Sequence, residues 1–87
     1  MASGESRRVT MYGADWCGDC RRTKAQLDGL GVPYDFVDLV VRPEAAETAR
    51  AIAGRTNIPV VVYPDGEHAV EPTDAALAAK VRELGLA

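Results

Sequence analysis

The sequence predicts an α/β fold in which three helices flank a four-stranded mixed sheet, in the order β-α-β-α-β-β-α. Short runs rich in β-branched residues alternate with longer segments whose apolar residues recur every three or four positions. Glycine or proline stands at most of the boundaries between them. The last two strand-like runs are joined through Asp65 and Gly66, a pair typical of a hairpin.

The N-terminal half predicts a β-α-β unit. Arg7–Gly13 is a β-branched and aromatic run closed by glycine, which is typical of a strand. A helix is predicted from Trp16 to the glycines at 29 and 31. Val32–Val40 has apolar residues on both faces, so we expect a strand buried between two helical layers. Within the predicted helix, the residues expected on the buried face recur every three or four positions: Cys20, Thr23, Leu27 and Leu30.

The C-terminal half predicts a helix, a hairpin and a last helix. The segment 43–54 is predicted as a helix, because it begins with proline, has acidic residues near its start and ends with glycine. Ile58–Pro64 and His68–Glu71 are predicted as the strands of the hairpin, and Thr73 as the cap of the final helix. A β-α-β crossover makes its strands parallel and a hairpin makes them antiparallel, so the sheet is mixed.

Composition limits the class of protein. A chain of 87 residues that is 47% hydrophobic and 26% charged is expected to form one globular domain. We assign this domain to residues 7–87 and a flexible leader to residues 1–6. The net charge of -3 leaves no basic face for nucleic acid. The sequence has neither a secretory signal nor a run of about 20 apolar residues, so no membrane association and a cytoplasmic location are predicted.

The two cysteines of the chain, Cys17 and Cys20, are separated by two residues. In a reducing compartment such a pair indicates redox chemistry or metal binding. Cys17 falls at the N-terminus of a helix, where the dipole stabilises a thiolate, and Cys20 falls one turn inside. The inner thiol can then attack a mixed disulfide on the outer one. A metal site needs about four ligands, and the chain has one histidine, His68, so no metal is expected.

These features resemble the thioredoxin superfamily and, within it, the small glutaredoxin-like proteins. The resemblance runs from about residue 7 to residue 84 and depends on "WCGDC" after a strand, "NIPVVV" further along, the "DG" hairpin and the "TD" helix start. Tryptophan before the first cysteine and glycine after it are most similar to mycoredoxins, which use mycothiol in place of glutathione. The resemblance implies a thioredoxin/glutaredoxin fold and thiol–disulfide oxidoreductase activity.

The resemblance also assigns roles to residues. Cys17 is implied to be the nucleophile and Cys20 the resolving thiol. Pro59 matches the proline that the superfamily holds in cis, so the backbone of Ile58 is implied to face the cysteines and to bind an extended substrate. The alternative for Pro59 is an ordinary strand-initiating proline. Trp16 is either a wall of the substrate groove or packing for the end of the sheet.

Asp74 matches the acid with which glutaredoxins help to hold the low-molecular-weight thiol, although an acid at this position also stabilises a helix N-terminus. Three departures from the family pattern matter. Asp19 lies between the cysteines, where its charge opposes thiolate formation, while Arg21 and the basic residues after it favour the thiolate if their charged groups reach it. The alternative is that Asp19 simply stabilises the N-terminus of the helix. The glycine pair that usually precedes the acid is replaced by Glu71 and Pro72, and an upstream lysine is missing. These changes weaken glutathione as the co-substrate and leave mycothiol open.

The sequence therefore predicts an enzyme that reduces protein disulfides or protein–mycothiol mixed disulfides. No tightly bound cofactor is expected, with mycothiol or glutathione as co-substrate and electrons from mycothiol disulfide reductase or thioredoxin reductase. One alternative is a redoxin served by thioredoxin reductase that donates electrons, for example to ribonucleotide reductase. The other is a carrier that holds a metal between its two cysteines.

Overall fold

The computed structural model describes residues 7–87, and the predicted leader, residues 1–6, lies outside the described residues. The elements follow the predicted order, which confirms the fold class. No helix among the described residues is long and apolar enough to span a membrane. The elements are β1 (Val9–Gly13), α1 (Gly18–Leu30), β2 (Tyr34–Asp38), α2 (Ala45–Ala53), β3 (Val60–Val62), β4 (His68–Val70) and α3 (Asp74–Glu83).

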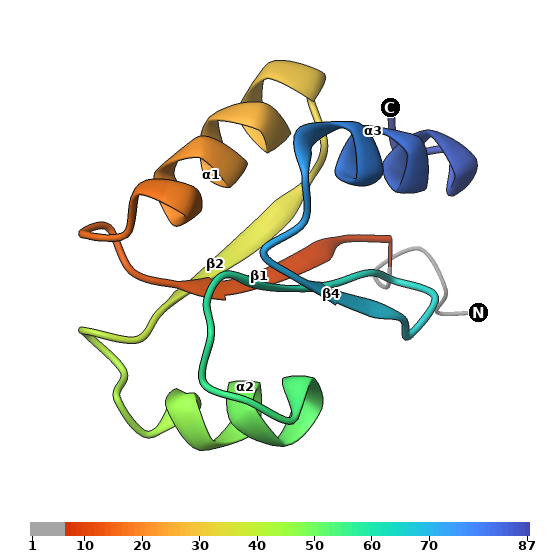
Figure 1. The fold of residues 1–87 in the computed structure, drawn as a ribbon. Coiled ribbons are helices and arrows are strands. Elements are labelled where there is room, and N and C mark those ends of the chain that lie inside the picture. The colour runs from red at the N-terminus through yellow and green to blue at the C-terminus, as the bar shows by residue number, and fades with distance from the viewer. Residues whose placement is uncertain (1–6) are drawn as a thin grey trace.

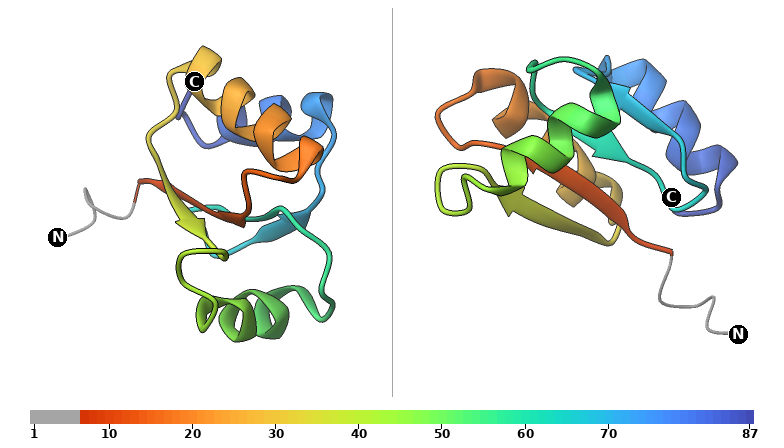
Figure 2. Two further views of the ribbon diagram at one scale, coloured as in Figure 1. Left: turned by 90° about the vertical axis from the view of Figure 1, so that its left-hand side faces the viewer. Right: turned by 90° about the horizontal axis from the view of Figure 1, so that it is seen from below.

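The four strands form one mixed sheet in the spatial order β2-β1-β3-β4. β1 pairs in parallel with β2 and antiparallel with β3, and β3 pairs antiparallel with β4. Helices α1 and α3 cover one face of the sheet and α2 covers the other (Figure 1). The views in Figure 2 show the same three layers from the side and from below.

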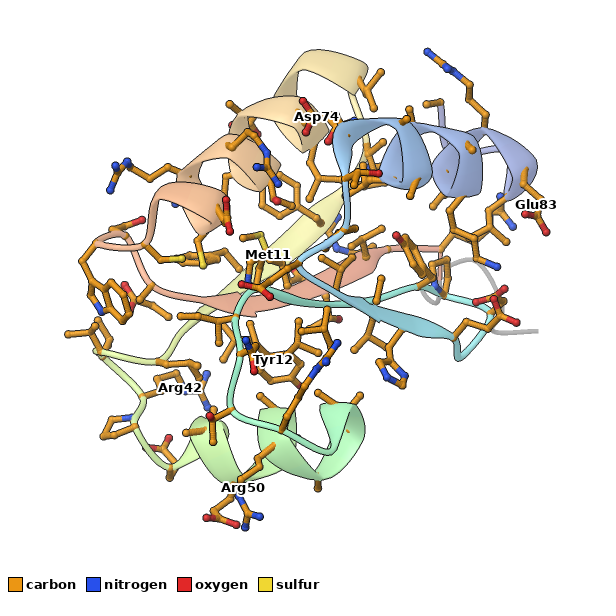
Figure 3. All side chains as sticks on the ribbon, in the orientation of Figure 1. Met11, Tyr12, Arg42, Arg50, Asp74 and Glu83 are labelled. Carbon is orange, nitrogen blue, oxygen red and sulfur yellow. The ribbon has the colours of Figure 1, made fainter. Side chains whose placement is uncertain are left out.

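The main core lies between the sheet and helices α1 and α3. Successive residues of a strand point to opposite faces, and Figure 3 shows Met11 on the side of α1 and α3 and Tyr12 on the side of α2. On the α2 side, Ala49 is the one buried residue that the helix contributes. The buried cluster consists of Val9, Met11, Cys20, Leu27, Val32, Val61, Tyr63, Leu77 and Val81.

The prediction that the second strand is buried on both faces was wrong. β2 is shorter than the predicted segment, and none of its five residues is fully buried. The reason is its place at the edge of the sheet, with only β1 beside it. Its residue Asp35 is exposed and forms an ion pair with Arg8 at 2.9 Å. Arg8 itself precedes β1, because this strand begins at Val9 and not at the predicted Arg7.

The predicted helix ends agree with the structure to within two residues. α1 begins at Gly18, two residues later than predicted, and ends at Leu30, followed by the C-cap Gly31, whose φ of 70° is left-handed. α2 is shorter than the predicted 43–54 segment at its N-terminus, where Glu44 is the cap. Thr73 caps α3 as predicted, since its Oγ accepts a hydrogen bond from the backbone N–H of Ala76 at 3.1 Å.

Candidate active site

Cys17 is the N-cap residue of α1. Its backbone is extended, with φ -87° and ψ 122°, and its carbonyl accepts a bond from the N–H of Arg21 at 3.1 Å. Its own N–H donates to the carbonyl of Ala14 at 3.2 Å, which closes the loop that leads out of β1. The Cys17 sulfur is partly exposed and lies at the positive end of a 13-residue helix. The sequence-based position of the outer thiol is therefore confirmed.

The Ile58–Pro59 peptide bond is cis, as the resemblance implied. The carbonyl oxygen of Ile58 lies 4.0 Å from the sulfur of Cys17. The carbonyl of Pro59 accepts a bond from the N–H of Glu71 at 2.9 Å, so the turn before β3 is tied to the end of β4. The structure thus brings together two segments far apart in sequence, one with the thiol and one with a backbone group that faces it.

Cys20 lies one turn further along α1 and is completely buried. Burial raises the pKa of its thiol to about 12; a hydrogen bond from the backbone of Ala14 acts in the opposite direction, and the neighbouring Cys17 and the charge of Asp19 raise the pKa further. Both cysteines are free thiols. At neutral pH, Cys20 is therefore held as a protonated thiol beside Cys17.

Gly13 is a site residue that the sequence reasoning missed. It is the last residue of β1, and a Cβ atom placed on it would lie 2.7 Å from the Cys20 sulfur and 3.4 Å from the ring of Phe36. The signal was available, because a glycine closes the strand just before the cysteine motif. We refer to Gly13, Ala14, Cys20 and Phe36 as the inner thiol site.

Trp16 is 71% exposed, so it does not pack against the end of the sheet. Val40 and Val41, which follow β2, are also exposed at 64% and 74%. The loops that carry them leave the same end of the sheet, where the N–H of Leu39 donates to the carbonyl of Gly13 at 2.9 Å. We refer to Trp16, Cys17, Ile58 and Pro59 as the outer thiol site.

The basic residues of α1 are engaged with the loop before Cys17. The guanidinium of Arg21 donates to the backbone carbonyl of Asp15 at 2.7 Å. The ammonium of Lys24 pairs with the carboxylate of Asp15 at 3.1 Å and lies 4.0 Å from the centre of the Phe36 ring. The sequence reasoning also missed Asp15, whose carbonyl and carboxylate anchor both cations. The modulating role predicted for Arg21 stays a prediction.

Arg22 links α1 to the start of α3. Its guanidinium contacts the carboxylates of Asp19 and Asp74, each at 3.1 Å, and the carbonyl of Pro72 at 3.2 Å. Figure 3 shows Asp74 at the end of α3 that adjoins α1. An open cleft of about 410 Å³ lies here, which we call the α3 cleft; it is lined by Asp19, Arg22, Glu71, Thr73 and Asp74.

A second cleft, of about 230 Å³, lies between α2 and the segment that leads to Pro59. Its lining is apolar at Leu39, Ala46, Ala49 and Ile58. Its charged residues are Arg55, Arg50 and Glu47, and the last two form an ion pair at 2.6 Å. Ile58 therefore takes part in both places, since it lines this cleft and its carbonyl oxygen lies 4.0 Å from the Cys17 sulfur. In residues 7–87 no group of three or more histidine, cysteine, aspartate or glutamate side chains is arranged to hold a metal.

The family model for glutaredoxin matches residues 9–69. The chain belongs to the glutaredoxin family. A relative in this family, Mycoredoxin 1 of Corynebacterium glutamicum, is 39% identical over 77 residues, which cover 87% of this chain and 95% of that protein. Membership gives the C-x-x-C pair the general chemistry of thiol–disulfide exchange.

Solved structures of glutaredoxins share the fold. The glutaredoxin grx-1 from Archaeoglobus fulgidus matches with a TM-score of 0.77 at 26% identity, over 94% of each chain. The glutaredoxin-like NrdH-redoxin from Escherichia coli matches with a TM-score of 0.71 at 28% identity, over 83% of this chain and 92% of that one. The resemblance inferred from the sequence is therefore confirmed at the level of fold and family.

For a glutaredoxin, the predicted site residues form two groups. Trp16, Cys17, Ile58 and Pro59 lie at the outer thiol site, with Cys20 directly behind it. Asp19 and Asp74 line the α3 cleft and are joined through Arg22.

Proposed function

We propose that this protein reduces protein–mycothiol mixed disulfides, with Cys17 as the nucleophile and Cys20 as the resolving thiol. One observation carries the proposal: a partly exposed sulfur at a helix N-cap faces the Ile58 carbonyl, with a second, buried thiol one turn behind it. The 39% identity to Mycoredoxin 1 supports mycothiol as the co-substrate. We assign the activity to a single domain, residues 7–87, acting in the cytoplasm, where thiols stay reduced.

The reaction begins when the Cys17 thiolate attacks the mycothiol sulfur of the mixed disulfide. A Cys17–mycothiol bond forms, the substrate sulfur leaves as a thiolate, and it takes up a proton. A second mycothiol thiolate can then attack the bound mycothiol sulfur, which releases mycothiol disulfide and restores Cys17. Alternatively, Cys20 loses its proton and attacks the Cys17 sulfur, which expels mycothiol and leaves an internal disulfide. Two mycothiol thiolates then attack in turn, which restores both cysteine thiols and forms mycothiol disulfide. On either route, mycothiol disulfide reductase returns the two electrons from NADPH to the mycothiol disulfide.

We assign the low-molecular-weight thiol to the α3 cleft. Three of the five residues that line it are acidic, and one, Arg22, is basic and already pairs with two of the carboxylates. Glu71 adds a carboxylate at a position whose φ of 51° favours glycine. The excess of negative charge in the cleft repels a thiol that carries two carboxylates, as glutathione does. It suits mycothiol, whose hydroxyl groups can donate to carboxylate oxygens.

The proposal is tested by NADPH oxidation with one mycothiolated protein substrate and two electron sources. One source is mycothiol with its reductase, and the other is thioredoxin reductase. We expect turnover with the mycothiol system and none with the Cys17→Ser variant. Turnover with neither source, under conditions in which a known glutaredoxin is active, would contradict the proposal.

The choice of thiol is tested separately with mycothiolated and glutathionylated forms of the same substrate. Glu71→Gln is expected to raise turnover of the glutathionylated form about threefold to tenfold, because it removes one of the charges that repel glutathione. The matched control is Glu83→Gln, which removes the same charge at the opposite end of α3 (Figure 3). An equal change in both variants would contradict the assignment of the α3 cleft.

A second candidate is a redoxin that accepts electrons from thioredoxin reductase. The likeness to NrdH-redoxin favours it, since the structure of that protein is described as explaining a thioredoxin-like activity profile. The exposed Trp16 is a second favourable observation, because an exposed aromatic side chain beside a nucleophile can contact a protein partner. Turnover with thioredoxin reductase alone would support this candidate and replace the mycothiol assignment.

A further inference from the structure

We propose that Gly13 is a positioning residue for the resolving thiol: the missing side chain at this position provides the space in which the Cys20 sulfur lies. This inference rests on the proposed function, because it concerns the two-cysteine route. Gly13 itself makes no contact with substrate in this proposal. It acts through Cys20, and its effect is on the balance between the dithiol and the internal disulfide.

The direction of the missing side chain follows from the alternation along β1. Val9 and Met11 point to the face that α1 and α3 cover, and both belong to the buried cluster that contains Cys20. Gly13 is the next residue of that face, so a side chain here would point at α1. A Cβ atom on Gly13 would lie 2.7 Å from the Cys20 sulfur, which is closer than real Cβ contacts come.

The surroundings leave the sulfur little room to move inward. Cys20 has no exposed surface, and the Phe36 ring would lie 3.4 Å from the added Cβ. The backbone of Ala14, the residue after Gly13, is also near enough to the sulfur to lower the pKa of the Cys20 thiol. In this proposal an added methyl group displaces the sulfur away from β1, in the direction of Cys17, the neighbouring thiol that also acts on its pKa. In the disulfide the two sulfurs are about 2.05 Å apart, so the Cys20 sulfur has already moved in that direction.

The redox consequence has a definite sign. The methyl group in Gly13→Ala destabilises the dithiol, whose sulfur occupies the space beside Gly13, more than the disulfide. We expect the equilibrium to shift at least about tenfold toward the disulfide, which makes the potential about 30 mV more negative for this two-electron couple. The internal disulfide forms when the Cys20 sulfur displaces the leaving thiol from Cys17, so this shift favours the two-cysteine route.

The test equilibrates the full-length protein with mixtures of reduced and oxidised dithiothreitol and measures the internal disulfide by alkylation and mass spectrometry. The matched control is Gly29→Ala, because a Cβ on this α1 glycine meets nothing within 4 Å. We expect the shift in Gly13→Ala and less than a twofold change in Gly29→Ala. A change below twofold in Gly13→Ala, or a shift toward the dithiol, would overturn the inference.

A denaturation cycle decides the question even if Gly13→Ala folds poorly. Gly13→Ala is made in wild type and in Cys20→Ala, which has no sulfur to displace. We expect a lower urea midpoint in the first background and a clearly smaller loss in the second, where the Cys20 Cβ at 3.3 Å and the Phe36 ring at 3.4 Å are the close neighbours that remain. An equal loss in both would overturn the inference. A wild-type protein that forms no internal disulfide would contradict the two-cysteine route, and this cycle would still decide the role of Gly13.

Discussion

The inner and outer thiol sites are one helical turn apart, and they differ in almost every physical respect. At the outer site Cys17 is partly exposed, faces a backbone carbonyl and has the exposed Trp16 beside it. At the inner site Cys20 is completely buried, and burial raises the pKa of its thiol to about 12. The same amino acid therefore stands in two different environments, one outside the core and one inside it.

This difference shows how a small protein can combine reactivity with stability. The inner site belongs to the apolar layer that holds α1 on the sheet, so changes there act on folding as well as on chemistry. The outer site is built from loop segments at the end of the sheet, so changes there act mainly on the reaction. The predictions that follow test this separation.

The largest effect is expected from Cys17→Ser. Removal of the nucleophile should lower turnover of a mixed disulfide below about one-hundredth of wild type, with the free energy of unfolding little changed. Cys20→Ser keeps the nucleophile and is expected to retain turnover by the route that needs one cysteine. The NADPH-coupled assay measures both variants. Equal activity of Cys17→Ser and wild type would contradict the assignment of the reaction to the outer thiol site.

A matched pair of large apolar residues tests where stability is located. Leu27 is completely buried two turns beyond Cys20 on the same face of α1, so Leu27→Ala should destabilise the protein by about 2–5 kcal/mol. Trp16→Ala should change the free energy of unfolding by less than about 0.5 kcal/mol, because the side chain is 71% exposed. Urea denaturation measures both changes. A larger loss for Trp16→Ala would mean that the outer site also supports the fold.

The stability of the inner site should fall at alkaline pH. The Cys20 thiol keeps its proton in the folded state up to a pKa of about 12, compared with 9.0 for a free thiol. The unfolded state therefore loses this proton first, and the contribution of Cys20 is complete below pH 9.0 and declines as the pH rises toward 12. Burial also raises the pKa values of Tyr34 and Tyr63, which act in the same direction.

Denaturation of wild type and Cys20→Ala across this range separates the cysteine from the tyrosines. Both proteins should lose stability as the pH rises, and wild type should lose more because the variant lacks the thiol. Parallel curves for the two proteins would show that the Cys20 thiol is not shielded from solvent in the folded state.

The smallest effect is expected for Arg22→Ala. Its contacts with Asp19 and Asp74 are between exposed side chains, and such pairs contribute about 0.2–1 kcal/mol. Arg82→Ala, at an exposed arginine of α3, serves as the control and should change stability by less than about 0.5 kcal/mol. High salt should reduce the difference between the variants. A loss above about 2 kcal/mol would show that the link between α1 and α3 supports the fold.

The elements and their order could be predicted from the sequence because their signals are local. Helical spacing, the cap at Thr73 and the Asp65–Gly66 hairpin depend on residues within a few positions of one another. The position of the two thiols on one helical turn also follows from spacing alone. The ends of the elements were predicted less accurately. The spacing of apolar residues was compatible with a helix that starts at Trp16, but the extended backbone of Cys17 means that α1 starts after Cys17.

By itself, the sequence determined the order of the elements, the cysteine pair at a helix N-terminus and the resemblance to glutaredoxins. The tertiary structure decided that β2 is an edge strand, that the Ile58 carbonyl faces Cys17 and that Arg22 joins Asp19 to Asp74. It also decided that Gly13 leaves space for the Cys20 sulfur. Local signals depend on neighbours along the chain, whereas these contacts join residues that only packing of the whole domain brings within a few ångströms.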